Sequence, residues 1–182
     1  MKFVDLFDAD GIFLITPNYI LRRIAAEEKP YYEELARTEH PEIPRSCDAP
    51  LVWDDLMSED DLLTCSILQK DTEVFCGFCQ LQHISSTTPE LGIDLLPIYQ
   101  HSGIAAEVLP LFLTQAKKLL QNDHFYSKIK KSNIASQKLA EKIGGICIGE
   151  KNLLPADFPD SLRAIAEKEF PDFFYLEYHF MK

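Results

Sequence analysis

The sequence predicts one α+β domain, with a mixed, mostly antiparallel sheet and helices on both of its faces. Its 182 residues are 46% hydrophobic and 26% charged, which is typical of a single globular domain with a sizeable core. Two apolar runs, 64–68 and 74–82, flank a polar turn and are typical of a β-hairpin. Apolar residues then recur at helical spacing over 103–120.

The first fifty residues predict a short strand followed by helical segments. Residues 11–15 form a brief apolar run, and Thr16-Pro17 then favours a helix start, because proline fits the first helical turn. That helix would present an apolar face made of Ile20, Leu21 and Ile24. A second helical piece begins at Pro30, and its apolar residues are Tyr31, Leu35 and Ala36. The proline-rich segment 41–50 predicts a loop.

The later elements follow the same two periodicities. The sequence predicts a helix cap at 58–61, a polar loop at 85–89, strands at 64–68, 74–82, 90–96, 126–129, 146–148 and 173–180, and helices at 103–120, 134–143 and 160–168. The first of these helices should kink at Pro110, and it carries on one side the apolar residues Ile104, Val108, Leu111, Phe112 and Leu119. The second should end at Gly144-Gly145, since glycine adopts the left-handed cap conformation.

Charge and composition narrow the range of partners. Eighteen basic and 29 acidic residues give a formal charge of −11, which repels nucleic acid and attracts cationic amines, or only keeps the chain soluble. Residues 1–5 do not resemble a signal peptide, and no 18-residue apolar run occurs, so we expect no membrane insertion. The odd number of cysteines, five, favours a reducing compartment and a cytoplasmic location.

The most informative segment joins the strand 90–96 to the helix 103–120. An apolar strand stops at Pro97, a polar turn follows, and Gly103 stands where the helix begins. A helix start leaves backbone N–H groups unpaired and adds the positive end of the helix dipole, so it suits a pyrophosphate. Gly103 would let the backbone approach the phosphates, because glycine has no side chain.

This turn resembles the acetyl-CoA loop of the GNAT superfamily, whose pattern is Gln/Arg-x-x-Gly-x-Gly/Ala. Gln100, Gly103 and Ala105 occupy its three defined positions. Residues 132–145 resemble the Asn-x-x-Ser…Glu-Lys-Leu-Gly-Phe helix and turn of the same family, with Gly145 in place of the phenylalanine. The strings Glu90-Leu91-Gly92 and Ala105-Ala106-Glu107 are similar to those of the ribosomal-protein-alanine N-acetyltransferase branch.

The resemblance implies an N-acetyltransferase that moves acetyl from acetyl-CoA to a primary amine by direct attack, without a metal. It implies a GNAT fold whose sheet is splayed where CoA inserts, with a substrate-side helical region at 1–57, an acetyl-CoA-binding core at 58–150 and a C-terminal helix and strand at 151–182. Similar proteins are often homodimers. The residues expected at acetyl-CoA are Leu95, Leu96, Gln100, His101, Ser102, Gly103, Ile104, Ala105, Asn133 and Ser136.

Two side chains are expected to handle protons. Glu90 begins the strand that leads to the loop, so it could accept the proton of an ammonium or hold the cation in place, or simply be a surface carboxylate. Many relatives carry a tyrosine at the position of Ala140, and without it Ser136 would protonate the leaving thiolate. Ser136 could instead bond backbone in the first helical turn. Asn133 would cap that helix and contact the pantetheine arm.

Three further patterns favour structural roles. Cys76 and Cys79 lie three apart in a strand, where side chains point to opposite faces, so we expect neither a disulfide nor a metal between them. Asp8 and Asp10 resemble the first motif of haloacid-dehalogenase-like phosphatases, which use magnesium, but a solvated turn is favoured. The histidines are isolated in sequence and should serve packing or the surface; they are His83, His101 and His179.

Two alternatives to an active acetyltransferase remain open at this point. A protein of the same fold could bind CoA without catalysis, as a sensor or scaffold, and a phosphatase is a remote second alternative. The amine itself could be a protein N-terminus, a polyamine, an amino acid or an antibiotic, because residues 1–57 resemble nothing more specific than variable substrate-side helices.

Overall fold

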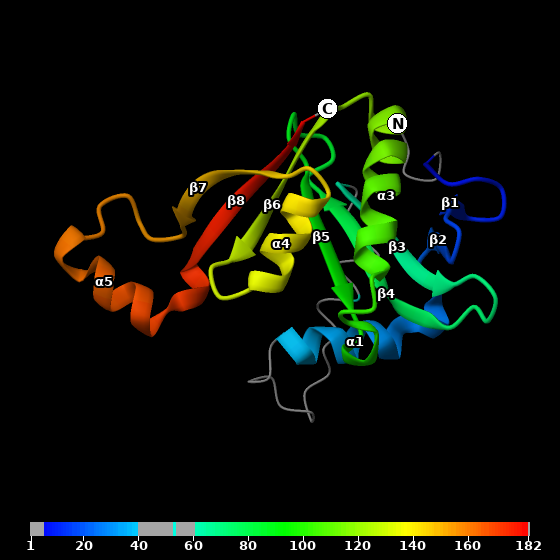
Figure 1. Ribbon diagram of the computed structural model, residues 1–182, viewed down its shortest axis with the longest axis horizontal. Coiled ribbons are helices and arrows are strands. Elements are labelled where there is room, and N and C mark those ends of the chain that lie inside the picture. The colour runs from blue at the N-terminus through cyan, green and yellow to red at the C-terminus, as the bar shows by residue number, and fades with distance from the viewer. Residues whose placement is uncertain (1–5, 40–52, 54–60, 182) are drawn as a thin grey trace. The chain divides into compact units, whose positions relative to one another are not determined.

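The computed structural model describes residues 6–39, 53 and 61–181, and the chain divides into two compact units, Met1–Asn122 and Asp123–Lys182 (Figure 1). In the first unit the strands are hydrogen-bonded in the order β1-β2-β3-β4-β5, and in the second in the order β6-β8-β7. The pairs within each unit are antiparallel, in agreement with the mostly antiparallel sheet that the sequence predicts.

The strands are β1 (Ile12–Ile15), β2 (Tyr19–Arg23), β3 (Leu62–Gln69), β4 (Phe75–Gln82), β5 (Glu90–Leu95), β6 (His124–Lys130), β7 (Ile146–Asn152) and β8 (Phe174–Met181). The α-helices are α1 (Lys29–Glu39), α3 (Ile104–Leu120), α4 (Ile134–Lys142) and α5 (Asp160–Glu169), and the 3-10 helices are η2 (Ala26–Glu28), η3 (Pro97–Tyr99) and η4 (Pro171–Phe173). The predicted hairpin and the predicted helices from residue 103 onward are confirmed, with ends shifted by one or two residues. The loop predicted at 41–50 and most of the cap predicted at 58–61 lie outside the described residues.

The helix predicted after Thr16-Pro17 is wrong, because residues 19–23 form strand β2. The Thr16 backbone N–H donates to the Tyr19 carbonyl at 2.8 Å, and the Thr16 hydroxyl accepts from the Tyr19 N–H at 2.9 Å. These bonds close a tight turn at Pro17-Asn18, which returns the chain antiparallel to β1. Aromatic and β-branched residues at 19 and 20 favour a strand, and pairing of β2 with β3 completes it.

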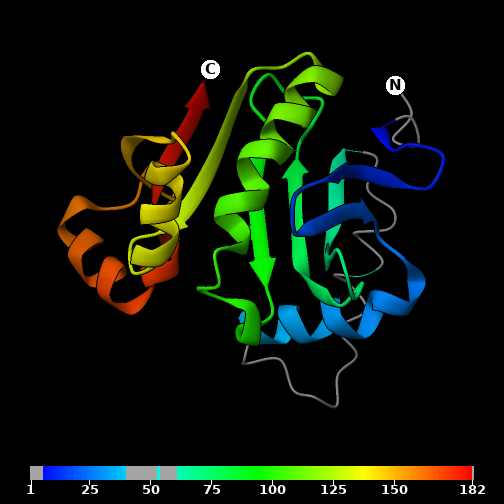
Figure 2. The same cartoon turned by 45° about the vertical axis from the view of Figure 1, so that its right-hand side comes forward.

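Helices cover both faces of the first unit's sheet, as predicted. On one face Tyr32 of α1 stacks on Phe78 of β4, with ring centroids 4.8 Å apart, in a buried cluster with Leu35, Trp53 and Phe75. On the other face Phe112 of α3 packs against Phe13 of β1 at 5.2 Å. Figure 2 shows α3 lying over the strands and α1 running crosswise to them. Burial of these large rings joins the helices to the two faces of the sheet.

Helix α3 buries a single stripe and continues through Pro110. The stripe consists of Ile104, Val108, Leu109, Phe112 and Ala116. Its members recur at steps of about four residues, so Leu111, one residue from Phe112, is turned about 100° away. Leu111 is 41% exposed and lies outside this buried stripe, although the sequence places it on the same side as Val108 and Phe112. The Pro110 carbonyl accepts a hydrogen bond from the Thr114 hydroxyl at 2.7 Å.

A buried carboxylate joins the start of α1 to the sheet. Glu28 is 3% exposed and accepts hydrogen bonds from the Ser66 hydroxyl at 2.7 Å, the Arg22 guanidinium at 2.9 Å and the Ala25 N–H at 2.9 Å. The Tyr32 hydroxyl lies 2.9 Å from that of Ser66 and extends the network. A buried charge is tolerated only when it is paired and hydrogen-bonded, and Glu28 is both.

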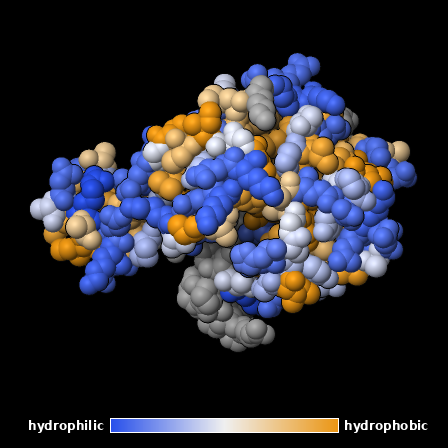
Figure 3. All heavy atoms as spheres, in the orientation of Figure 1, coloured by the Kyte–Doolittle hydropathy of each residue, from blue (hydrophilic) through white to orange (hydrophobic). Residues whose placement is uncertain are grey.

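The second unit places α4 on one face of β6, β8 and β7. Helix α4 ends at Lys142, and Gly144 shortly after it has the predicted left-handed conformation, with a φ of 93°. Between β7 and β8, helix α5 carries apolar residues among charged ones on its surface (Figure 3), including the exposed Leu162 and Ile165. Lys131, after β6, bonds Glu150 of β7 at 2.8 Å and also Glu167 of α5, so it fastens α5 to the sheet. Among the described residues, no helix is long and apolar enough to cross a membrane.

Replacing Glu28 by alanine should lower the free energy of unfolding by about 3 kcal/mol, because Arg22 and Ser66 would lose their buried acceptor. Urea unfolding followed by circular dichroism measures the change. Glu27→Ala is the matched control, since Glu27 is exposed in the same turn and should change stability by less than about 0.5 kcal/mol. Equal effects of the two variants would contradict the role given to Glu28.

Candidate functional site

The turn between β5 and α3 has the backbone of an anion site. Gly103 is the N-cap of α3, with a φ of 90° that side-chain-bearing residues rarely adopt. A Cβ built on Gly103 would meet no atom within 4 Å, so open space lies beside this backbone. The N–H groups of the first helical turn, beginning at Ile104 and Ala105, point out of the helix end without intrahelical partners. This end of α3 can therefore receive an anionic group.

Two side chains of the turn, those of Gln100 and Ser102, bond its backbone and hold its shape. The Gln100 side-chain amide donates to the Leu95 carbonyl at 3.1 Å, and the Ser102 hydroxyl donates to the Tyr99 carbonyl at 2.5 Å. The Leu96 N–H donates to the Cys76 carbonyl at 2.9 Å and ties the strand end to β4. His101 is exposed with a φ of 59°. Gln100 and Ser102 thus fix the path of the backbone that would meet the anion.

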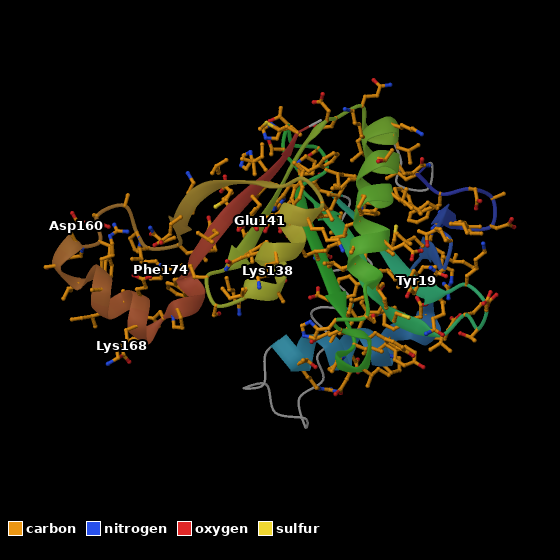
Figure 4. The ribbon with its side chains drawn as sticks, in the orientation of Figure 1. Tyr19, Lys138, Glu141, Asp160, Lys168 and Phe174 are labelled. Atoms are coloured by element: carbon orange, nitrogen blue, oxygen red, sulfur yellow. The ribbon has the colours of Figure 1, made fainter. Side chains whose placement is uncertain are left out.

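Glu107, in the first turn of α3, anchors this helix to the β1–β2 turn. Its carboxylate accepts from the Thr16 hydroxyl at 2.6 Å and from the Asn18 backbone and side-chain nitrogens at 3.0 and 2.8 Å. Burial alone would raise the pKa of Glu107, but these hydrogen bonds lower it overall. Tyr19, labelled in Figure 4, lies beside them, and burial, Cys76 and Glu107 raise its pKa. The string Ala105-Ala106-Glu107 was noted in the sequence, but it gave no sign that Glu107 anchors the helix.

One face of β5 carries two carboxylates. The register pairs Glu90 with Gln82, Gly92 with Gln80 and Asp94 with Phe78, so all three β5 residues lie on the face that α1 covers. Glu90 and Asp94 are half-buried and about 13 Å apart along the strand. Asp94 was not singled out in the sequence, although its spacing from Glu90, an even number of strand residues, places both on one face.

The cysteines of β4 have the character of core residues. Cys79 is paired with Cys65 across the hairpin, and burial raises the pKa of both thiols well above their ordinary value. Burial raises the pKa of Cys76 to about 11. Next to it, a Cβ on Gly77 would lie 2.1 Å from the Asp94 carbonyl oxygen, so only glycine lets β4 approach β5 there. These cysteines are free thiols, and burial makes them poor nucleophiles.

In the second unit, Asn133 caps α4 as predicted. Its side-chain oxygen accepts from the Ser136 N–H at 3.0 Å. The Ser136 hydroxyl is half-buried and makes no hydrogen bond with other described residues, so it does not bond the helix backbone. This geometry leaves that hydroxyl available as a proton donor.

The turn after α4 explains why Gly145 replaces the family's phenylalanine. A Cβ on Gly145 would lie 2.7 Å from the ring of Phe180, which comes from β8 and occupies that space. The nearby Tyr178 hydroxyl donates to Glu141 of α4 at 3.4 Å. Figure 4 shows Glu141 and Lys138 on α4. Burial, Cys147 and Glu141 raise the pKa of Tyr178. An aromatic ring is thus retained at this turn, but it comes from a distant part of the sequence.

The predicted isolation of His179 is wrong. Its imidazole lies 2.7 Å from the Glu177 carboxylate and 2.7 Å from the His124 ring. Glu177 precedes it by two residues on the same strand face, and His124 comes from the neighbouring strand β6. His83 is likewise 3.7 Å from the Asp61 carboxylate, at the surface. Glu177 is close to His179 in the sequence as well, whereas the His124–His179 and Asp61–His83 pairs are brought together only by the fold.

The aspartates near the N-terminus form the solvated turn that the sequence favours. Asp8 accepts from the Asp10 and Ile12 N–H groups at 3.0 and 2.7 Å, so its carboxylate bonds its own backbone. The turn lines an open hollow of about 580 Å³ together with Arg22 and Arg23, whose positive charges disfavour a magnesium ion. No cluster of three or more metal-ligating side chains occurs within residues 6–39, 53 and 61–181.

Comparisons with known proteins agree with this fold. Residues 9–146 match the family model of the acetyltransferase (GNAT) domain. The chain is similar to an acetyltransferase of Agrobacterium tumefaciens, with 22% identity, a TM-score of 0.65, and coverage of 93% of this chain and 94% of that one. It is similar to a proposed ribosomal-protein-serine acetyltransferase of Vibrio cholerae, with 16% identity, a TM-score of 0.66, and 92% and 96% coverage. No curated protein matches the sequence.

A third similar structure is the spermidine N-acetyltransferase of Vibrio cholerae in complex with CoA and spermine. The identity is 11%, the TM-score is 0.69, and the match covers 90% of this chain and 95% of that one. Identities this low establish the fold, which is the one predicted, and leave the acceptor open.

Removing the Glu107 carboxylate should loosen the anchor of α3 in a pH-dependent manner. Because its pKa is lowered on folding, its contribution is present above the ordinary value of 4.5 and is lost as the pH falls below that value. Glu107→Ala should therefore cost about 1 kcal/mol at pH 7 and less at pH 4, in urea unfolding. Asn18→Ala and the double variant test the contact itself, because a real bond makes the two effects non-additive. Full additivity, or a pH-independent effect, would refute the anchor.

Proposed function

The chain belongs to the acetyltransferase (GNAT) family, and we propose that it acts as one domain that moves the acetyl group of acetyl-CoA to a primary amine. The amine nitrogen attacks the thioester carbonyl carbon, the carbon–sulfur bond breaks, and the thiolate leaves as CoA. No covalent enzyme intermediate is needed. The observation that supports this best is the open backbone at Gly103 on the N-cap of α3, since the family uses acetyl-CoA, whose pyrophosphate suits such a helix end.

The same turn supports roles for the remaining loop residues. Ile104 and Ala105 offer backbone N–H groups to the pyrophosphate, and Gln100 and Ser102 keep that backbone in shape. Leu95 and Leu96 would offer backbone to the pantetheine arm. The Leu95 carbonyl already accepts one bond from Gln100, but a carbonyl has a second lone pair. His101 would only flank the anion.

The two carboxylates of β5 would act on the amine, which is the acceptor of the acetyl group. An ammonium must lose a proton before its nitrogen can attack, and Glu90 would accept that proton directly or through a water. Asp94, on the same face, would hold positive charge on the acceptor. The overall charge of −11 draws cations to the protein. A primary amine of positive charge is therefore the acceptor class that this face suits.

Ser136 would return a proton to the leaving thiolate. Its half-buried hydroxyl is not used by the helix backbone, and Ala140 leaves no tyrosine to do this. Asn133, by resemblance, contacts the pantetheine arm while it caps α4. The proposal includes a cytoplasmic location and, as in many similar proteins, a homodimer.

Gly103→Val should weaken acetyl-CoA binding by at least about tenfold, because valine cannot adopt the φ of 90° without strain and the turn must change shape. Isothermal titration calorimetry measures the affinity. Gly149→Val is the matched control, since Gly149 also has a positive φ and open space around it but lies on β7. Unchanged affinity in Gly103→Val would exclude this turn as the CoA site.

The Glu90→Gln variant distinguishes two roles of Glu90, a general base and a group that holds the amine in place. The same assay tests whether the protein turns over at all. A base predicts a lower kcat, by about 100-fold, and loss of the acidic limb of the pH–rate profile, whereas an anchor predicts a higher KM. Steady-state release of CoA with an active amine gives both constants, and Asp94→Asn, which should raise KM alone, is the comparison. Wild-type constants in Glu90→Gln would exclude both roles. Binding of acetyl-CoA by the wild type without turnover of any amine would indicate a sensor or scaffold instead.

A further inference from the structure

Three residues form a row across the middle of the first unit's sheet, on the face that carries Glu90 and Asp94. Thr64 of β3 is directly opposite Gln80 of β4, and Gln80 is directly opposite Gly92 of β5. Directly opposed residues point to the same face, so the threonine and glutamine side chains lie side by side there. The row lies one step beyond the ring of Phe78, which α1 covers.

The glutamine side chain extends over the glycine. A Cβ built on Gly92 would lie 3.3 Å from the Gln80 Cγ and 3.4 Å from its Nε2. The amide of Gln80 therefore lies above β5 between Glu90 and Asp94, which are two residues away on either side of Gly92. A side chain at position 92 would displace this amide, so the glycine provides the room that it occupies.

Both polar groups of the row lack hydrogen-bonding partners among the described residues. The Thr64 hydroxyl is buried, with the residue 7% exposed, and no atom of the described residues bonds it. The half-buried Gln80 amide has no hydrogen-bonding partner within the described part of the chain. A buried hydroxyl without a partner destabilises a fold, and such groups are explained when a ligand completes them. The two carboxylates of the face, in contrast, have partners of their own.

We propose that Gln80, with Thr64 beside it, determines acceptor specificity by binding a neutral amide of the acceptor next to its reactive amine. The inference rests on the proposed acetyl transfer and adds the class of acceptor, an amine that carries an adjacent amide. Such an acceptor presents its ammonium to a carboxylate of β5 and its amide to the Gln80 side chain, which can donate and accept at once.

A plain alkyl amine or diamine fits this row less well. Its methylene groups would remove water from the half-buried Gln80 amide without replacing the lost hydrogen bonds, and would leave the Thr64 hydroxyl unpaired. Sites built to bond a polar group reject analogues that lack it, because the protein's own groups are then left unpaired. Discrimination of at least about tenfold is expected for one such group.

The test compares alaninamide with isopropylamine, in which a methyl group replaces the carboxamide, and with 1,4-diaminobutane. The measured quantity is kcat/KM with acetyl-CoA, from the release of CoA. Gln80→Leu keeps the size but not the hydrogen bonds, and should lower the alaninamide-to-isopropylamine ratio by at least about tenfold. Gln80→Glu keeps the shape and adds a charge, so it should shift the preference toward the diamine. Gln82→Leu is the matched control on the same strand and face, and should leave the ratio within about twofold.

Thr64→Val provides a readout that does not need substrate. Because it removes an unpaired buried hydroxyl, it should raise the melting temperature by about 2 °C while lowering the alaninamide preference. A lower melting temperature would mean that the fold itself uses the hydroxyl, and would remove Thr64 from the proposal.

The outcomes separate this inference from the proposed function. Turnover of these amines with a ratio unchanged in well-folded Gln80→Leu, or an equal effect of Gln82→Leu, overturns the inference alone. No turnover with any amine, although acetyl-CoA binds, overturns the proposed function and the inference with it.

Discussion

The alternation of side chains along β5 is the constraint on which the first unit's site depends. Leu91 faces away from the α1 side and is 4% exposed, and the even-numbered residues Glu90, Gly92 and Asp94 are left for the opposite face. A one-residue slip in the pairing with β4 would exchange the two sets and bury both carboxylates. The close approach at Gly77 and the Leu96–Cys76 hydrogen bond oppose such a slip, so they hold β5 in its register.

Local patterns were sufficient wherever an element's own sequence decides its structure. The β3–β4 hairpin, α3, α4 with its Gly144 end, and the strand before Pro97 were all predicted, because turn residues and periodicity act over a few positions. The spacing of Ile20, Leu21 and Ile24 fits a helix as well as a strand. There the pairing of β2 with β3, far away in sequence, decides the outcome.

The candidate site divides in the same way. The turn at Gly103 could be predicted because an anion site at a helix start needs only the local order of strand, turn and glycine. The roles of Glu107, Asp94 and Gln80 could not, because each depends on a residue at least 12 positions away in the sequence. These residues are Asn18 for Glu107, Phe78 for Asp94 and Gly92 for Gln80. His179 belongs to the same class, since the His124 ring that contacts it comes from another strand. In the sequence, Gly145 lacks the aromatic side chain that the family pattern has at this position. The structure shows that the ring of Phe180 fills the space there.

The two substrates of the proposed reaction have opposite charges, and in this proposal the chain binds them with different groups. An acidic protein repels an anionic donor at long range, so the donor's site must be electropositive by local means. At the start of α3 the backbone provides this local positive potential. Its unpaired N–H groups and the helix dipole would attract phosphate without a lysine or arginine in the turn. On β5 the carboxylates of Glu90 and Asp94 provide a negative potential, which would favour a cationic amine and disfavour phosphate. Backbone donors for the anion and carboxylates for the cation allow one strand and the helix after it to serve both, without oppositely charged side chains neutralising each other.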